Sequence, residues 1–98
     1  MRTIDRSTRF KRDFKRELKG SHRATLAADL QTVLTALVND TTLDPKNRDH
    51  DLSGDWAGYR DCHVKPDLVL IYAKPDDATL RAAVLTRWPD GSASVVVV

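Results

Sequence analysis

The clearest pattern of apolar positions in the chain predicts a helix over residues 26–38. Its apolar side chains recur three and four positions apart, which gathers them into one stripe along a helix. Asn39 or Asp40 can end this helix. The stripe is predicted to face the core, and it consists of Leu26, Leu30, Val33, Leu34, Leu37 and Val38.

A second helix is predicted to begin at Ser7 or Thr8, because either side chain can cap its first turn. Gly20 offers a helix stop. Basic residues fill the faces between the apolar positions. Two such helices form a hairpin that can cover one face of a sheet. The apolar positions of this helix are Phe10, Phe14 and Leu18.

Two runs rich in aromatic and β-branched residues, 59–64 and 68–72, predict an antiparallel hairpin. The segment Lys65-Pro66-Asp67 between them has the composition of a turn. With a three-residue loop, His63 and Asp67 become cross-strand partners whose Cβ atoms lie about 4.5–5.5 Å apart. A two-residue loop shifts this pairing by one position.

Further strands are predicted on either side of this hairpin. Residues 2–5 form a weak candidate strand, and residues 79–86 form a third strand after a turn at 74–77. Residues 95–98 are strand-like, without a partner visible in the sequence. Helices followed by strands indicate the α+β class. At 98 residues the chain is expected to form one domain, residues 1–98.

Charge is unevenly distributed along the chain. Residues 1–23 hold nine Lys or Arg against three acids, so this part carries +6 and the remainder −4 of the total +2. Such a basic block suits a polyanion or an acidic partner protein. No apolar run approaches the roughly 20 residues that span a bilayer. The single cysteine, Cys62, cannot form an internal disulfide, which favours a cytoplasmic location.

Chemically active side chains gather between residues 49 and 72. They include two histidines, His50 and His63, together with several carboxylates, an arginine and a lysine. His50 lies outside any apolar pattern and is expected on an exposed loop. Strand alternation places Asp61 on the face of His63 and Arg60 on the opposite face.

The segment 49–72 reads Asp-His-x-Leu-x-Gly-x-Trp-x-Gly-Tyr-Arg-Asp-x-His-Val-x-Pro-Asp-x-x-Leu-Ile-Tyr. This motif resembles the YafQ branch of the RelE/ParE superfamily of bacterial type II toxins. The resemblance implies a RelE-like fold, with two N-terminal helices packed on a small antiparallel sheet. It also implies cleavage of mRNA in the ribosomal A site and neutralisation by a cognate antitoxin, which is expected to be of the ribbon-helix-helix type.

In the YafQ-like family, the positions that match His50, His63 and Asp67 belong to the catalytic residues. RNA cleavage without a metal needs a base for the 2′-hydroxyl, an acid for the 5′-oxygen and positive charge for the phosphorane. Imidazole suits proton transfer near neutral pH, and no cofactor or metal is expected. Asp61, Trp56 and Tyr59 are supporting candidates. The candidates for binding phosphate or RNA are Arg60, Arg81, Arg87, Lys65, Lys11, Arg12 and Lys15.

The chain departs from the family near its C-terminal end. YafQ-like toxins carry a histidine after their last strand, whereas this chain has no histidine beyond His63. Asp90 is a possible substitute. An alternative function is therefore a non-cleaving protein of the same fold, which binds an antitoxin or inhibits a topoisomerase. A zinc site from His50, Cys62 and His63 is disfavoured, because Cys62 and His63 point to opposite sides of a strand.

Overall fold

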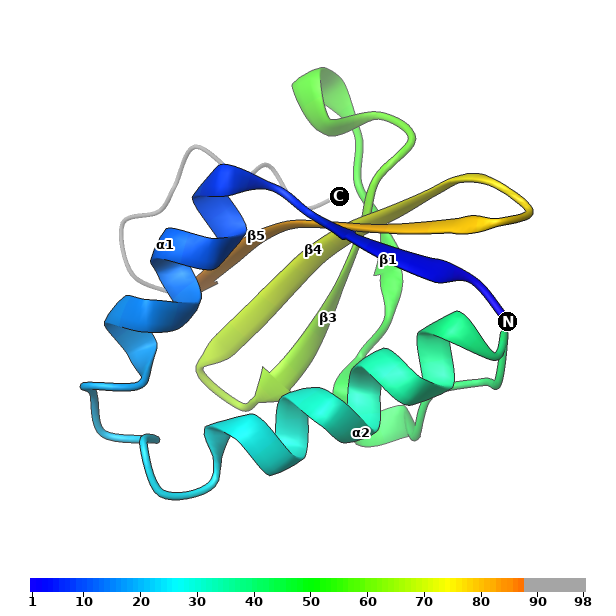
Figure 1. The fold of residues 1–98 in the computed structure, drawn as a ribbon. Helices are drawn as coiled ribbons and strands as arrows, with labels where there is room; N and C mark the ends of the chain where they lie inside the picture. The colour runs from blue at the N-terminus through cyan, green and yellow to red at the C-terminus, as the bar shows by residue number, and fades with distance from the viewer. Residues whose placement is uncertain (88–98) are drawn as a thin grey trace.

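The computed structural model describes residues 1–87 as two helices and a five-stranded sheet (Figure 1). The strand order is β1-β5-β4-β3-β2, in which β1 runs parallel to β5 and all other neighbours are antiparallel. The fold is α+β, as expected. The elements are β1 (Thr3–Arg6), α1 (Thr8–Glu17), α2 (Leu26–Val38), the short 3₁₀ helix η1 (Pro45–Asn47), β2 (His50–Asp51), the 3₁₀ helix η2 (Gly54–Trp56), β3 (Arg60–Lys65), β4 (Leu68–Asp76) and β5 (Thr79–Arg87).

Helix α2 matches the predicted stripe over residues 26–38. All six of its apolar positions are buried, and they share a core with residues of β3, β4 and β5 such as Cys62, Leu70 and Leu80. Burial of this kind stabilises the fold by roughly 25 cal/mol for each Å² of apolar surface removed from water. The face of the sheet toward α1 and α2 is therefore the main core.

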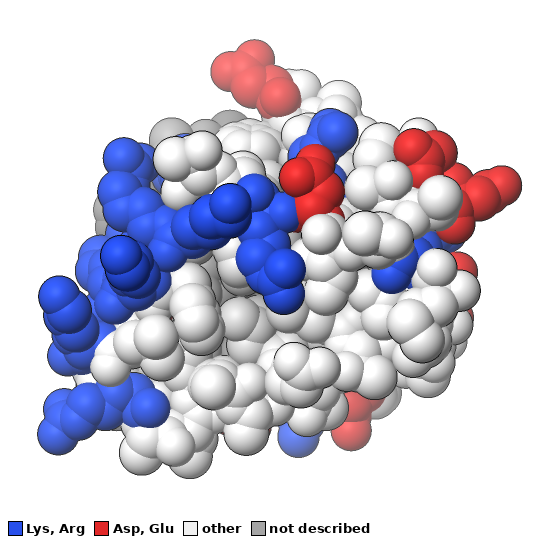
Figure 2. Space-filling model, in the orientation of Figure 1, with Lys and Arg blue, Asp and Glu red and all other residues white. Residues whose placement is uncertain are grey.

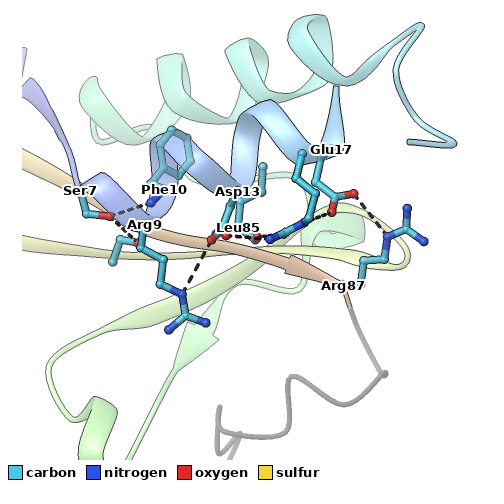
Figure 3. Close-up of polar contacts among 9 residues, drawn as sticks. Ser7, Arg9, Phe10, Asp13, Glu17, Leu85 and Arg87 are labelled. Atoms are coloured by element: carbon cyan, nitrogen blue, oxygen red, sulfur yellow. Dashed lines mark hydrogen bonds and ion pairs between the residues drawn. The ribbon is translucent and has the colours of Figure 1, made fainter. Parts of the chain in front are cut away.

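Helix α1 begins as predicted, because the Ser7 hydroxyl accepts a hydrogen bond from the Phe10 N–H at 2.9 Å. The two acids of α1 turn inward: Asp13 and Glu17 are 4% and 3% exposed. Asp13 accepts a hydrogen bond from the Leu85 N–H of β5 at 3.1 Å (Figure 3). The basic side chains of α1 are consequently left at the surface.

The turn between β3 and β4 is shorter than the sequence suggested. It contains only Pro66 and Asp67, so Lys65 pairs with Leu68, and an irregularity of β3 between His63 and Lys65 sets His63 opposite Val69. Proline and aspartate both suit the centre of a tight turn. The predicted cross-strand pair of His63 and Asp67 is therefore wrong.

The predicted turn at residues 74–77 is also wrong. Strand β4 continues through Pro75 to Asp76, and the turn is formed by Asp77 and Ala78. The pairing of β4 with β5 is irregular between Ala73 and Asp76. A proline in an irregular stretch need not remove a regular ladder hydrogen bond, which explains why Pro75 does not end the strand.

The two outermost strands differ in how well the sequence indicated them. Strand β1 confirms the weak candidate near residues 2–5. His50 lies in strand β2, opposite Asp61, and not on a loop as expected. The strand-like run at 95–98 and Asp90 lie outside the described residues. Within residues 1–87, no helix is long and apolar enough to cross a membrane.

Candidate active site

Three titratable side chains meet on the face of the sheet that points away from α1 and α2, here called the outer face. His50 on β2 is paired with Asp61 on β3, and His63 is two residues further along β3. Alternate residues of a strand point to the same side, so all three lie on the outer face. Val69, Ile71, Ala83 and Val84 form the apolar part of this face, and Leu52, Trp56 and Tyr59 pack against them.

The ring of His50 is oriented by its backbone neighbour. Nδ1 lies 2.8 Å from the Arg48 carbonyl oxygen, which can only accept a hydrogen bond, so Nδ1 carries a proton and donates it. Asp61 Oδ1 lies 2.9 Å from the same nitrogen as an ion-pair contact. In a neutral ring the basic nitrogen is then Nε2, which is buried without a hydrogen-bond partner among residues 1–87.

His63 has the same arrangement at the end of β3. Its Nδ1 lies 3.1 Å from the Pro66 carbonyl oxygen, so Nδ1 again donates and Nε2 is the nitrogen available for proton transfer. The tight turn brings this carbonyl to the ring. Two imidazoles with defined tautomers therefore flank Asp61.

Asp61 is a buried carboxylate, with 1% of its surface exposed. Burial raises its pKa above the usual value, while the nearby rings of His50 and His63 act in the opposite direction. Its Oδ1 has no hydrogen-bond partner among the described residues.

Asp67 binds an imidazole that the sequence did not indicate. Its Oδ1 lies 2.6 Å from Nε2 of His22, in the connection between α1 and α2. Both side chains are partly exposed. His22 belongs to no motif and lies 45 residues from Asp67, so only the three-dimensional structure could identify this pair.

Arg60 lies on the helix side of the sheet, opposite to His63 as expected. It makes a bidentate contact with Asp49, at 3.2 Å from both Nε and Nη2, and its Nη1 is 2.5 Å from Asp51. The Tyr72 hydroxyl donates to Asp49 at 2.5 Å. Burial and this hydrogen bond raise the pKa of Tyr72 above its ordinary value. To bind a phosphate, Arg60 would have to give up its contacts with the carboxylates of Asp49 and Asp51.

The other predicted cations lie in different places. Arg81 Nε is 3.4 Å from Asp5 Oδ2, and the pKa of Arg81 is raised by hydrogen bonds with Tyr59 first and Asp5 next. Its contact with Tyr59 places Arg81 beside the outer face. Arg87 Nε is 3.3 Å from Glu17 Oε1 (Figure 3).

The basic side chains over α1 form a band on the surface, as Figure 2 shows. Lys11, Arg12 and Lys15 are exposed, and none of them forms an ion pair with a residue of the described part of the chain. The acids of α1 pair instead with Arg9 and Arg16. Lys11, Arg12 and Lys15 therefore concentrate positive charge along the exposed side of α1.

Cys62 lies on the opposite side of β3 from the two histidines. It is 0% exposed, and burial raises its pKa above the usual value. This geometry agrees with the expectation that Cys62 does not share a metal with His50 and His63. Within residues 1–87, no cluster of three or more His, Cys, Asp or Glu side chains is arranged to hold a metal ion.

Comparison with known proteins gives a consistent result. A family model described as a bacterial toxin of type II toxin-antitoxin system, YafQ, matches residues 2–88. The mRNA interferase toxin YafQ of Escherichia coli strain B/BL21-DE3 is 40% identical over 76 residues, which are 76% of this chain and 79% of that protein.

Solved structures agree with these sequence relatives. The crystal structure of YafQ from E. coli BL21(DE3) has a TM-score of 0.77 and 36% identity, and the match covers 90% of this chain and 94% of that one. YafQ in the E. coli DinJ-YafQ complex has a TM-score of 0.75 and 35% identity, over 89% and 93% of the two chains.

Proposed function

Because this chain belongs to the YafQ family of bacterial toxins of type II toxin-antitoxin systems, we propose that it is an endoribonuclease that cleaves mRNA in the ribosomal A site. A relative at 40% identity is named an mRNA interferase toxin. The observation that carries the proposal is the pair of oriented imidazoles, His50 and His63, on either side of buried Asp61.

The proposed reaction uses these groups for proton transfer. Nε2 of one histidine takes the proton of the 2′-hydroxyl, and Nε2 of the other, when protonated, gives a proton to the departing 5′-oxygen. Nε2 of His50 is buried, so this role requires the His50 ring to turn toward the bound RNA. Asp61 stabilises the imidazolium that forms on the base and the imidazolium that the acid carries before it gives up its proton. Arg81 lies on the same side of the sheet but five positions along β5 from Thr86, the residue level with His63, so we assign it to flanking RNA and not to the scissile phosphate. Asp67, held by His22, is a further candidate at the margin of the site.

The test is cleavage by the purified full chain in a bacterial translation extract. Primer extension should reveal cuts within ribosome-bound codons and no cuts in the same mRNA without ribosomes. Intact mRNA at saturating protein would refute the nuclease proposal. If a protein that leaves mRNA intact still bound its antitoxin, the alternative of a non-cleaving toxin would be supported. The absence of any histidine after His63 in the sequence favours that alternative.

We also propose that the partner is an antitoxin segment with acidic and apolar residues. YafQ of E. coli has been solved in complex with DinJ. In the present chain, a groove of about 430 Å³ lies between α1 and α2. Phe10, Phe14 and Leu34 provide its apolar surface, and Lys11 and Lys15 provide positive charge. An acidic amphipathic segment complements both properties.

Charge reversal tests this docking site. The double substitution Lys11→Glu and Lys15→Glu is expected to weaken binding of the antitoxin encoded beside this chain by at least about tenfold, since interfacial charge pairs of this kind couple by about 1.5 kcal/mol or more. Calorimetric titration at several salt concentrations measures the effect. Lys74→Glu, which changes a lysine paired with Asp40 outside the groove, is the matched control. Equal affinities for all three proteins would exclude the groove.

A further inference from the structure

A second cavity lies next to His63, beside the start of strand β2. Strand β2 pairs only with Arg60 and Asp61, so the following residues of β3 face the 3₁₀ helix η1 instead of a strand. Asn47 of η1 donates from Nδ2 to the His63 carbonyl oxygen at 2.7 Å. This bond fixes η1 beside the edge of β3, where the cavity of about 280 Å³ is found.

The walls of this cavity offer several kinds of polar group. Lys46 is exposed and forms no ion pair with any residue in the described part of the chain. Lys65 is held by an ion pair with Asp29 and by the Thr25 hydroxyl at 2.5 Å from Nζ. The charge of Lys65 is therefore largely balanced, whereas Lys46 provides a positive charge that a bound anion can use.

The apolar and acidic parts of the cavity limit what can bind. Val64 and Pro66 line it without polar side chains, and the carboxylate of Asp29 is 45% exposed at its wall. The ion pair with Lys65 balances the charge of Asp29, but its carboxylate oxygens can still accept further hydrogen bonds. A ligand with one phosphate, an apolar ring surface and hydroxyl groups matches all of these walls, because carboxylates accept hydrogen bonds from sugar hydroxyls.

We propose that this cavity is a subsite for one ribonucleotide of a bound RNA strand, with Lys46 contacting its phosphate and Asp29 facing its sugar. Its volume of about 280 Å³ lies just below the roughly 300–1,000 Å³ of small-ligand sites, so it has room for at most a single nucleotide. The inference rests on the proposed function for its substrate class. His63 lines the cavity and also faces Asp61 on the outer face, so a nucleotide bound here adjoins the proposed cleavage site.

Binding of an uncleavable product-like probe tests the subsite directly. Adenosine 3′-monophosphate is titrated into the ¹⁵N-labelled full chain, and the backbone amides of Asn47 and Val64 and the Asn47 side-chain amide are followed by NMR. We expect shifts at these positions, and Lys46→Gln is expected to raise the dissociation constant about tenfold, the loss of one charge-assisted phosphate contact. Lys74→Gln is the matched control and should leave the dissociation constant within about twofold.

Two further probes define the ligand class. Inorganic phosphate and adenosine should each bind at least about tenfold more weakly than the nucleotide, because each makes only part of the contacts. Equal binding of inorganic phosphate would overturn the nucleotide assignment. Absent shifts at the cavity, or an unchanged dissociation constant for Lys46→Gln, would overturn the subsite. These results do not depend on cleavage. If the chain cleaves mRNA but shows no shifts at the cavity, only the subsite proposal is refuted. If it shows the shifts but does not cleave mRNA, only the nuclease proposal is refuted.

Discussion

Replacement of His63 by glutamine is expected to slow mRNA cleavage by about 10²- to 10⁴-fold, the usual contribution of one general acid or base. Glutamine keeps a polar side chain of similar length but cannot exchange a proton near neutral pH. Since the Nδ1 proton of His63 is fixed on the Pro66 carbonyl, no other nitrogen of this ring can replace Nε2. Single-turnover cleavage on programmed ribosomes measures the rate constant.

The same cleavage assay shows whether His50 and His63 act together in one reaction or independently of each other. If His50 and His63 act in one reaction, the double variant His50→Gln/His63→Gln should be little slower than the slower single variant. Thermal unfolding of each variant controls for loss of the fold. A His63→Gln protein that cleaves within about threefold of the parent rate would contradict a role in proton transfer.

Replacement of Asp61 by asparagine is expected to stabilise the fold at neutral pH while it lowers activity. The raised pKa means that the folded chain holds a proton on Asp61 at pH values where the unfolded chain has lost it. The free energy of unfolding therefore falls as pH rises from the usual aspartate pKa, about 3.9, through the raised value, and it stays lower above that value. Asparagine has no such ionisation.

The expected gain for Asp61→Asn at pH 7 is about 1–3 kcal/mol, the cost of an incompletely bonded buried polar group. Denaturant unfolding between pH 4 and pH 8 should show a flatter pH dependence than in the parent chain. Cleavage should fall by about 10²-fold or more, because the imidazolium loses its countercharge. An Asp61→Asn protein that is less stable than the parent at pH 7 would show that the contact with His50 outweighs the cost of burial.

Local patterns in the sequence predicted α2 and the start of α1 well because the controlling interactions are also local. Leu18, expected among the apolar positions of α1, instead lies past the end of that helix and is 37% exposed. The stripe of α2 and the Ser7 cap of α1 depend on residues three or four positions apart. The face shared by Asp61 and His63 likewise follows from strand alternation. These features required no knowledge of distant contacts.

The incorrect predictions concern features that depend on contacts between residues far apart in the sequence or on the detailed geometry of a turn. Asp67 lies within the β3–β4 turn, and an irregularity of β3 between His63 and Lys65 sets His63 opposite Val69. Composition alone determines neither feature. His22 meets Asp67 only because α1 and α2 fold back over the sheet. The inward direction of Asp13 depends on the position of β5. None of these contacts leaves a periodic signal in the sequence.

The parallel pairing of β1 with β5 has a consequence for how the chain folds. Residues 3–6 contact residues 79–82, so the beginning of the chain must wait for a strand that is synthesised last among those described. Such high contact order slows folding, whereas the hairpins of β3, β4 and β5 close between near neighbours. Docking of β1 is accordingly the late kinetic step, and a spectroscopic probe at Ile4 would report the completion of the sheet.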